Sequence, residues 1–111
     1  MDMSKYRAIK KRKIILGGTE RLYTVTEFPE FIRVRVYGSS KNSYADARFT
    51  WETAWGINQY KPSLAALIYD YAVRNGWNPE ANKPVSFTGE DILPDGWSNT
   101  EPDGSPEASR P

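Results

Sequence analysis

Cysteine and histidine are both absent from this chain of 111 residues. Without cysteine there is no disulfide framework, no thiolate nucleophile and no Cys-ligated zinc or iron–sulfur site. Without histidine the chain lacks the commonest general base, the commonest transition-metal ligand and the usual pH switch near neutrality. These absences exclude most familiar catalytic constellations, and we expect neither a metal nor another cofactor.

Carboxylates are the remaining groups for acid–base chemistry, since paired Asp or Glu residues can catalyse hydrolysis without histidine. The candidates lie on different segments, and no spacing brings two of them together: Glu27, Glu30, Asp46 and Glu52. The sequence therefore predicts a protein that is not an enzyme.

Long apolar runs are missing as well. No stretch approaches the ~18 residues of a membrane span, and no apolar segment follows the charges at the N-terminus. The lack of cysteine fits a reducing compartment. We therefore expect a cytoplasmic protein that has no contact with membranes.

Charge is unevenly distributed, although the net charge is only +1. Residues 1–13 contain six Lys or Arg and one acid, whereas residues 78–111 contain seven acids and two bases. From residue 90 onward the composition turns to proline, glycine, serine and carboxylates, which cannot form a core. We predict three parts: a basic arm over residues 1–13, one domain over residues 14–89, and a flexible acidic tail over residues 90–111. Within this tail, Ile92, Leu93 and Trp97 are apolar enough to pack against the domain.

Alternating apolar residues predict strands in the first half of the chain. Residues 31–37 place Ile32, Val34 and Val36 on one face, and residues 44–51 alternate in the same way. Proline begins residues 84–88, which we predict to be a short final strand at a sheet edge.

A hairpin is predicted around Gly17 and Gly18, because residues 14–16 and 21–27 flank this pair with strand-forming side chains. The inward face of residues 21–27 stays open, since two sets fit the pattern: Leu22, Thr24 and Thr26, or Tyr23 and Val25.

One amphipathic helix is predicted over residues 62–75, where apolar residues recur at intervals of three and four. Pro62 suits its first turn, with Lys61 or Ser63 as the N-cap. Gly76 suits the position after its end, so that Trp77 can cover the last turn near Tyr71.

Together these segments predict an α+β fold, in which an antiparallel β-meander of four to five strands packs one amphipathic helix on one face. The residues that we expect in the core are Leu22, Ile32, Val34, Val36, Ala47, Phe49, Trp51, Leu64, Leu67, Ile68, Tyr71, Trp77, Val85 and Phe87.

The run from Pro62 to Phe87, with its helix exit Asn75-Gly76-Trp77-Asn78-Pro79, resembles small uncharacterised bacterial proteins, some of them carried on mobile gene cassettes. Those proteins combine a β-meander, one helix and a Gly-Trp-Asn-Pro helix exit. The match covers about a quarter of the chain, and Lys61 departs from the Ser or Thr cap common in the group. The resemblance implies a fold and no known activity.

The basic arm is the first candidate site. Its last four residues, Lys10, Lys11, Arg12 and Lys13, form an unbroken cationic run that can neutralise phosphates. The alternative is a solvated leader, or one that pairs with the acidic tail of the same molecule.

The polar face of the predicted sheet is the second candidate. Arg33, Arg35, Tyr37 and Arg48 should share it with Tyr44 if the strands pair in sequence order. Guanidinium groups beside aromatic rings are typical of single-stranded nucleic-acid binders. The alternative is an ordinary wet sheet face, on which such residues only pair across strands.

The loop of residues 51–60 is the third candidate, because it places three aromatic residues around three polar ones: Trp51, Trp55 and Tyr60 around Glu52, Asn58 and Gln59. Aromatic walls with a few polar groups describe a small-ligand pocket or a protein contact. Trp51 continues the inward parity of its strand and is expected in the core, whereas Trp55 is less constrained.

From these observations we favour a non-catalytic interaction module that acts through a protein partner or as a homodimer. Aromatic residues make up 14% of the chain, which is more than so small a domain should bury. The alternative is nucleic-acid binding through the basic arm and the Arg/Tyr face of the sheet.

Overall fold

The computed structural model describes residues 10–99. Five strands and three helices follow one another along the chain: β1 (Lys10–Leu16), β2 (Thr19–Glu27), β3 (Phe31–Tyr37), β4 (Tyr44–Thr50), α1 (Trp51–Ala54), α2 (Pro62–Arg74), β5 (Val85–Thr88) and α3 (Gly89–Ile92).

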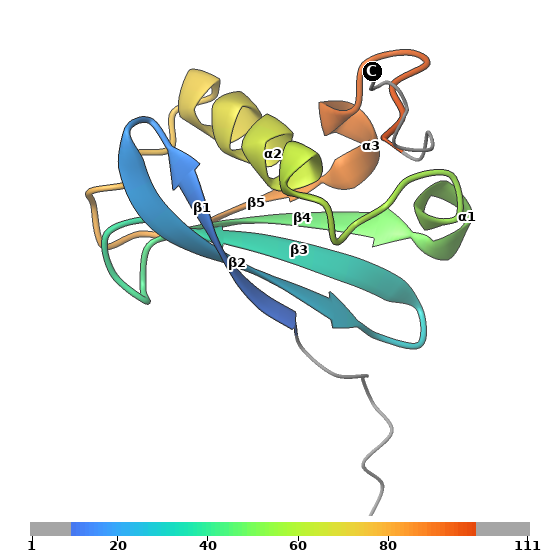
Figure 1. The fold of residues 1–111 in the computed structure, drawn as a ribbon, viewed down its shortest axis with the longest axis horizontal. Coiled ribbons are helices and arrows are strands. Elements are labelled where there is room, and N and C mark those ends of the chain that lie inside the picture. The colour runs from blue at the N-terminus through green and yellow to red at the C-terminus, as the bar shows by residue number, and fades with distance from the viewer. Residues whose placement is uncertain (1–9, 100–111) are drawn as a thin grey trace, which may run out of the picture.

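The strands form one sheet in sequence order, and α2 lies across one of its faces (Figure 1). Strands β1 to β4 pair antiparallel, as the meander predicts, whereas β5 pairs parallel to β4. The chain crosses the sheet through α2 before it enters β5, and such a crossover brings a strand back in the same direction. The predicted α+β class is confirmed, and β5 lies at an edge as expected.

The hairpin between β1 and β2 turns at Gly17 and Gly18. Their φ angles of 61° and 80° are both positive, as a two-residue type I′ turn requires. In the register between β2 and β3, Tyr23 and Val25 pair with Val36 and Val34, and they therefore face the helix. Both are fully buried.

The prediction that Leu22 lies in the core is wrong. Leu22 is 38% exposed on the opposite face of the sheet. Alternation in β2 allowed either parity, and the pairing with β3 selects the one that buries the larger Tyr23 side chain. The Tyr23 hydroxyl donates to the backbone oxygen of Tyr60 at 2.9 Å, so its burial leaves no polar atom unpaired.

Helix α2 packs a narrow face on the sheet through residues that are all buried: Leu64, Ala65, Ile68 and Ala72. Half-buried side chains extend this core to its margins, at Trp51, Leu67, Tyr71, Val85 and Phe87. Every predicted core residue except Leu22 is therefore in the core or packed against it.

Both ends of α2 follow from local residues. Lys61 is the N-cap, and its side chain makes no capping hydrogen bond, so Pro62 begins the helix without one. At the other end Gly76 has φ 104°, and the amides of Gly76 and Trp77 donate to the oxygens of Val73 and Ala72. This is the predicted Schellman ending. The Trp77 ring lies edge-on to Tyr69, with ring centres 5.8 Å apart.

Two boundaries differ from the predicted ones. Strand β1 begins at Lys10, so residues 10–13 belong to the sheet rather than to an arm. Residues 90–99 pack onto the domain, because Ile92 is buried and Asn99 exchanges hydrogen bonds of 2.7 and 2.9 Å with the backbone of Asn58. The remaining parts of the predicted arm and tail, residues 1–9 and 100–111, lie outside the described residues.

Gly89 provides a test of this packing, because a Cβ atom there would overlap the ring of buried Phe49. Gly89→Ala should lower the free energy of unfolding by about 1–3 kcal/mol, as overpacking does. The matched control is Gly56→Ala, whose Cβ would have its nearest neighbour, Thr53 O, at 3.6 Å. Chemical denaturation measures both, and equal stability of the two variants would contradict the described contact.

Candidate functional site

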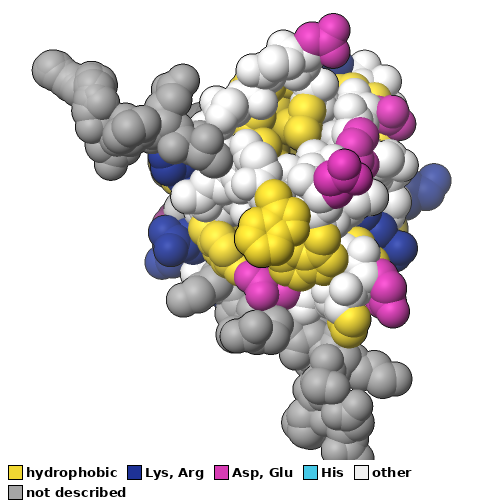
Figure 2. Space-filling view, turned by 90° about the vertical axis from the view of Figure 1, so that its right-hand side faces the viewer, with side chains coloured by type: hydrophobic (Ala, Val, Ile, Leu, Met, Phe, Trp, Pro, Cys, Tyr) yellow, Lys and Arg dark blue, Asp and Glu magenta, His cyan; other side chains and the backbone are white. Residues whose placement is uncertain are grey.

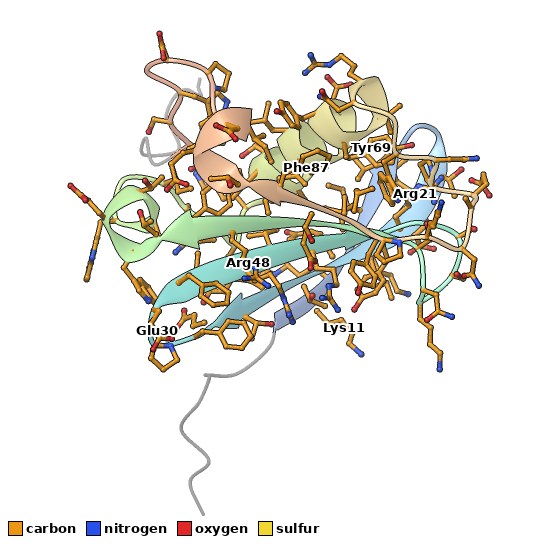
Figure 3. All side chains as sticks on the ribbon, turned by 180° about the vertical axis from the view of Figure 1, so that it is seen from behind. Lys11, Arg21, Glu30, Arg48, Tyr69 and Phe87 are labelled. Atoms are coloured by element: carbon orange, nitrogen blue, oxygen red, sulfur yellow. The ribbon has the colours of Figure 1, made fainter. Side chains whose placement is uncertain are left out.

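The sheet face opposite α2 is the candidate site, and we call it the outer face. No helix of residues 10–99 covers it (Figure 1). The strand registers place nine side chains of interest there: Lys11, Lys13, Leu22, Arg33, Arg35, Tyr37, Tyr44, Asp46 and Arg48. Figure 3 shows Lys11 and Arg48 on this side of the sheet, whereas Tyr69 and Phe87 lie toward α2. The predicted cluster of arginines and tyrosines is thus brought together.

Arg35 and Asp46 form the one tight ion pair of the outer face within the described part of the chain. Arg35 Nε and Nη2 donate to the two carboxylate oxygens of Asp46 at 2.6 and 2.9 Å, and Asp46 is only 4% exposed. The Arg35 guanidinium also lies 3.8 Å from the ring centre of Tyr44. The hydrogen bonds with Asp46 raise the pKa of Arg35 above its usual range. Because Asp46 is buried and both of its carboxylate oxygens accept from Arg35, this pair is part of the packed structure of the sheet.

Arg33 and Arg48 face each other across β3 and β4. Neither forms an ion pair with a carboxylate in residues 10–99. Burial lowers the pKa of Arg33, and the nearby charges of Arg35 and Arg48 lower it further, against an opposing effect of Asp46. Like charges placed directly opposite each other destabilise a sheet, so an anion bound here would relieve a real repulsion.

Aromatic rings support this arginine pair. The Arg33 guanidinium lies 5.2 Å from the ring centre of Phe28, and that of Arg48 lies 4.8 Å from that of Phe31. The two phenylalanine rings stack at 4.6 Å. Stacking on a ring holds a guanidinium in place while leaving its edge free for an oxyanion.

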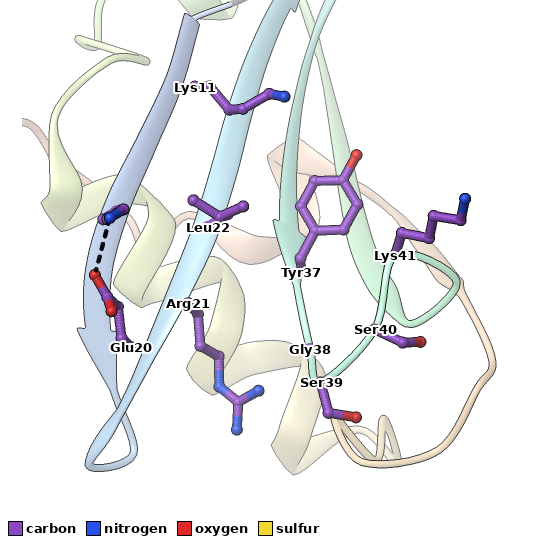
Figure 4. A pocket seen from close by; sticks show the side chains of 10 residues that line it. Lys11, Glu20, Arg21, Leu22, Tyr37, Gly38, Ser39, Ser40 and Lys41 are labelled. Atoms are coloured by element: carbon purple, nitrogen blue, oxygen red, sulfur yellow. Dashed lines mark ion pairs between the residues drawn. The ribbon is translucent and has the colours of Figure 1, made fainter.

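At the far end of β3 a groove of about 470 Å³ opens between the β1–β2 hairpin and the loop after β3 (Figure 4). Ten residues line it: Lys11, Lys13, Glu20, Arg21, Leu22, Tyr37, Gly38, Ser39, Ser40 and Lys41. Lys13 pairs with Glu20 at 3.8 Å, whereas Lys11 and Lys41 form no ion pair with residues 10–99. The groove therefore has a cationic rim.

Sequence reasoning missed Lys41 and the two serines beside it. They belong to a loop that packs on a distant segment: the amide of Ser39 donates to Pro79 O at 2.8 Å, and a Cβ on Gly38 would overlap that same oxygen. The only local signal was a lysine within a Gly/Ser loop directly after a strand that ends in tyrosine. The distance between Lys41 and Lys11 depends on how the strands pair, and no local sequence pattern specifies that pairing.

The basic run that was predicted as one patch is divided by the sheet. Lys11 and Lys13 lie on the outer face, whereas Arg12 lies on the α2 side opposite Tyr23. Its charge lowers the pKa of Tyr23, although burial has the larger effect and raises it. Lys10 belongs to the same strand and pairs with Val25.

The loop of residues 51–60 separates into core and surface. Trp51 is half-buried, and its Nε1 donates to Phe28 O at 2.9 Å. Tyr60 is also half-buried, and its hydroxyl donates to the Glu27 carboxylate. Trp55, by contrast, is 82% exposed, and Glu52 is exposed in α1. Figure 2 shows hydrophobic side chains gathered at this end of the molecule with acidic side chains beside them.

Within residues 10–99 no three carboxylates lie close enough together to hold a metal ion. None of the helices described has the length and apolar character needed to cross a membrane. No protein-family model, curated protein or solved structure matches the chain. The resemblance to small bacterial proteins stays a prediction, and any functional argument rests on the site itself.

The structural role of Arg35 can be separated from the free charge of Arg48. Arg35→Ala leaves the buried Asp46 carboxylate without its partner and should cost about 3 kcal/mol of unfolding free energy. Arg48→Ala removes an exposed side chain and should cost about 1 kcal/mol or less. Urea denaturation of both variants tests this difference. A similar loss of unfolding free energy in the two variants would mean that the Arg35–Asp46 pair stabilises the protein no more than an exposed arginine does.

Proposed function

We propose that this protein binds nucleic acid through the outer face of its sheet. The observation that carries the proposal is the Arg33–Arg48 pair, two opposed guanidinium groups without a carboxylate partner in the described chain, on a face that no described helix covers. Arginine is well suited to phosphate, because its planar fork can donate two parallel hydrogen bonds.

The arrangement of the other outer-face residues supports the proposal. Phe31 and Tyr37 lie at the two ends of β3, about 20 Å apart at ~3.4 Å per residue. Between them lies the Arg35–Tyr44 stack, and the groove with its lysine rim continues the cationic surface beyond Tyr37. Alternating cationic and aromatic groups along an exposed sheet match what phosphates and bases require.

The structure gives less support to a protein-interaction module than the aromatic content of the sequence does. The hypothesis of such a module rested on more aromatic residues than a small domain should bury, yet Trp55 is the only aromatic residue in residues 10–99 that is exposed. Trp77, Phe49 and Tyr23 are buried, and the others are at least partly covered. The number of aromatic residues is therefore weaker support for a protein contact than the two arginines without a described carboxylate partner are for an anion-binding site.

Binding should be electrostatic and should depend on Arg48. Wild-type protein should bind a short fluorescein-labelled oligothymidine at low salt, with affinity that falls steeply as salt rises, because phosphate contacts release counterions. Arg48→Ala should weaken binding and reduce the magnitude of the slope of log K against log salt by about 0.7, the value for one lost phosphate contact with a single strand. Fluorescence anisotropy across a salt series gives both quantities.

The matched control is Arg74→Ala, which also removes one positive charge but from the exposed Asp70–Arg74 pair of α2 (3.4 Å). It should leave the slope unchanged. If Arg48→Ala and Arg74→Ala weaken binding equally, the effect is one of net charge and the outer face is not the site. If wild-type protein binds no oligonucleotide at low salt, the proposal is wrong.

A protein contact through Trp55 is the second candidate function, favoured by the single observation that this large ring is 82% exposed. Large apolar side chains at the surface tend to mark interaction sites. Glu52, in the short helix α1 that ends at the C-cap Trp55, would give such a contact an acidic margin.

Self-association through this surface should depend on concentration and on the Trp55 ring. Light scattering on a sizing column should then show a dimer for wild-type protein and a monomer for Trp55→Ala, at both low and high salt, because the contact is apolar. Val73→Ala, an exposed apolar residue of α2, is the control and should remain a dimer. A wild-type monomer at all concentrations would rule out self-association through Trp55.

A further inference from the structure

We infer that the groove beside Tyr37 holds one unstacked nucleotide of a single strand, with its base against Tyr37 and Leu22 and its phosphate among Lys11 and Lys41. The inference rests on the proposed function and deepens it, because it specifies single-stranded nucleic acid and the place of one nucleotide. It concerns a different end of the outer face from the Arg33–Arg48 pair.

The floor of the groove is apolar and aromatic. The β2–β3 register ends with the pair Tyr23 and Val36, and Leu22 and Tyr37 are the residues next to this pair, so their side chains lie at the same end of the outer face. Figure 4 shows Tyr37 between Leu22 on one side and Lys41 on the other. The Tyr37 ring meets the ring of Tyr44, its neighbour on β4, edge-on at 6.0 Å, and this contact helps to hold its orientation. A flat ring of this kind offers a stacking surface to any base.

The walls of the groove are rigid before any ligand binds. Besides the contact of Ser39 with Pro79, the Gly38 amide donates to Ser43 O at 2.7 Å, and the Ser40 hydroxyl donates to Asn82 at 2.6 Å. On the β2 side, Arg21 is 6% exposed and pairs with Glu80 at 3.2 Å. A preformed groove avoids the entropic cost of ordering a loop on binding.

The cations at the rim are available. Lys11 and Lys41 are exposed and form no ion pair within the described chain, and the Lys13–Glu20 pair is exposed on both sides and therefore weak. A nucleotide carries both features that this groove offers: a flat base for the floor and a negative phosphate for the rim. Inorganic phosphate or a duplex backbone would use only the rim.

Duplex DNA cannot use the aromatic floor. Its bases are stacked on one another and present only their edges in the grooves. The ring of Tyr37 lines a groove between Leu22 and Lys41, so a base can lie against it only after leaving its stack. The geometry therefore favours a single strand over a duplex of the same sequence.

The test compares two anionic probes, labelled oligothymidine and inorganic polyphosphate, with the full chain at low salt. Tyr37→Ala should weaken oligothymidine binding by about one to two orders of magnitude, the loss expected for one stacked base, and should leave polyphosphate binding within about twofold. Tyr37→Phe keeps the ring and should restore oligothymidine binding. Lys41→Ala should weaken the binding of both probes, because both carry phosphate.

Val73→Ala is the matched control, since it removes an exposed apolar side chain from a different surface, on α2, and it should bind both probes as wild-type protein does. If wild-type protein binds oligothymidine but Tyr37→Ala binds it equally well, the nucleotide pocket is wrong while the proposed function stands. Equal affinity for oligothymidine and its duplex has the same meaning. If wild-type protein binds no nucleic acid, both proposals fail together.

A titration of the wild-type chain removes any dependence on how the variants fold. Amide resonances of the ¹⁵N-labelled protein should shift on addition of thymidine dinucleotide, with the largest changes in residues 37–41 and at Lys11. Shifts confined to residues around Trp55, or around Arg33 and Arg48 alone, would overturn the assignment of this groove.

Discussion

Burial of one face of the sheet beneath a single long helix is the constraint on which the rest of this structure depends. Side chains alternate along a strand, so once Val34 and Val36 pack under α2, Arg33 and Arg35 must point away from it. No second layer in the described chain covers that outer face. Burial of one face therefore explains why these side chains lie on the other face. The packing of the core does not constrain which polar or aromatic residues occupy that face.

The arginines of the outer face are held by two different kinds of contact. Arg35 is neutralised by Asp46, which lies almost fully buried beside it, so this pair strengthens the sheet. Arg33 and Arg48 are instead stacked on phenylalanine rings and keep their charge uncompensated by any described carboxylate. Stacking stabilises a cation without neutralising it, because the ring presents only a quadrupole. The same face therefore contains one arginine in a buried ion pair and two arginines that form no ion pair with a described carboxylate.

Two surfaces of distinct character lie at opposite ends of the sheet. The end near α1 displays the exposed ring of Trp55 with acidic neighbours, whereas the end near the β1–β2 hairpin contains the basic groove (Figures 2 and 4). The two surfaces therefore differ in charge and in the kind of side chain that they expose.

The sequence by itself indicated the five strands, apart from the start of β1, and the long helix with its glycine ending, because these depend on residue periodicity, on Pro62 and on Gly76. It also placed the arginines on one face, since alternation within a strand is local. Tertiary structure decided the parity of β2, the parallel entry of β5 and the meeting of Lys41 with Lys11 across the groove. Each of these depends on contacts between segments distant in the chain, for which the local pattern allows more than one arrangement and only the packing energy of the whole domain selects one.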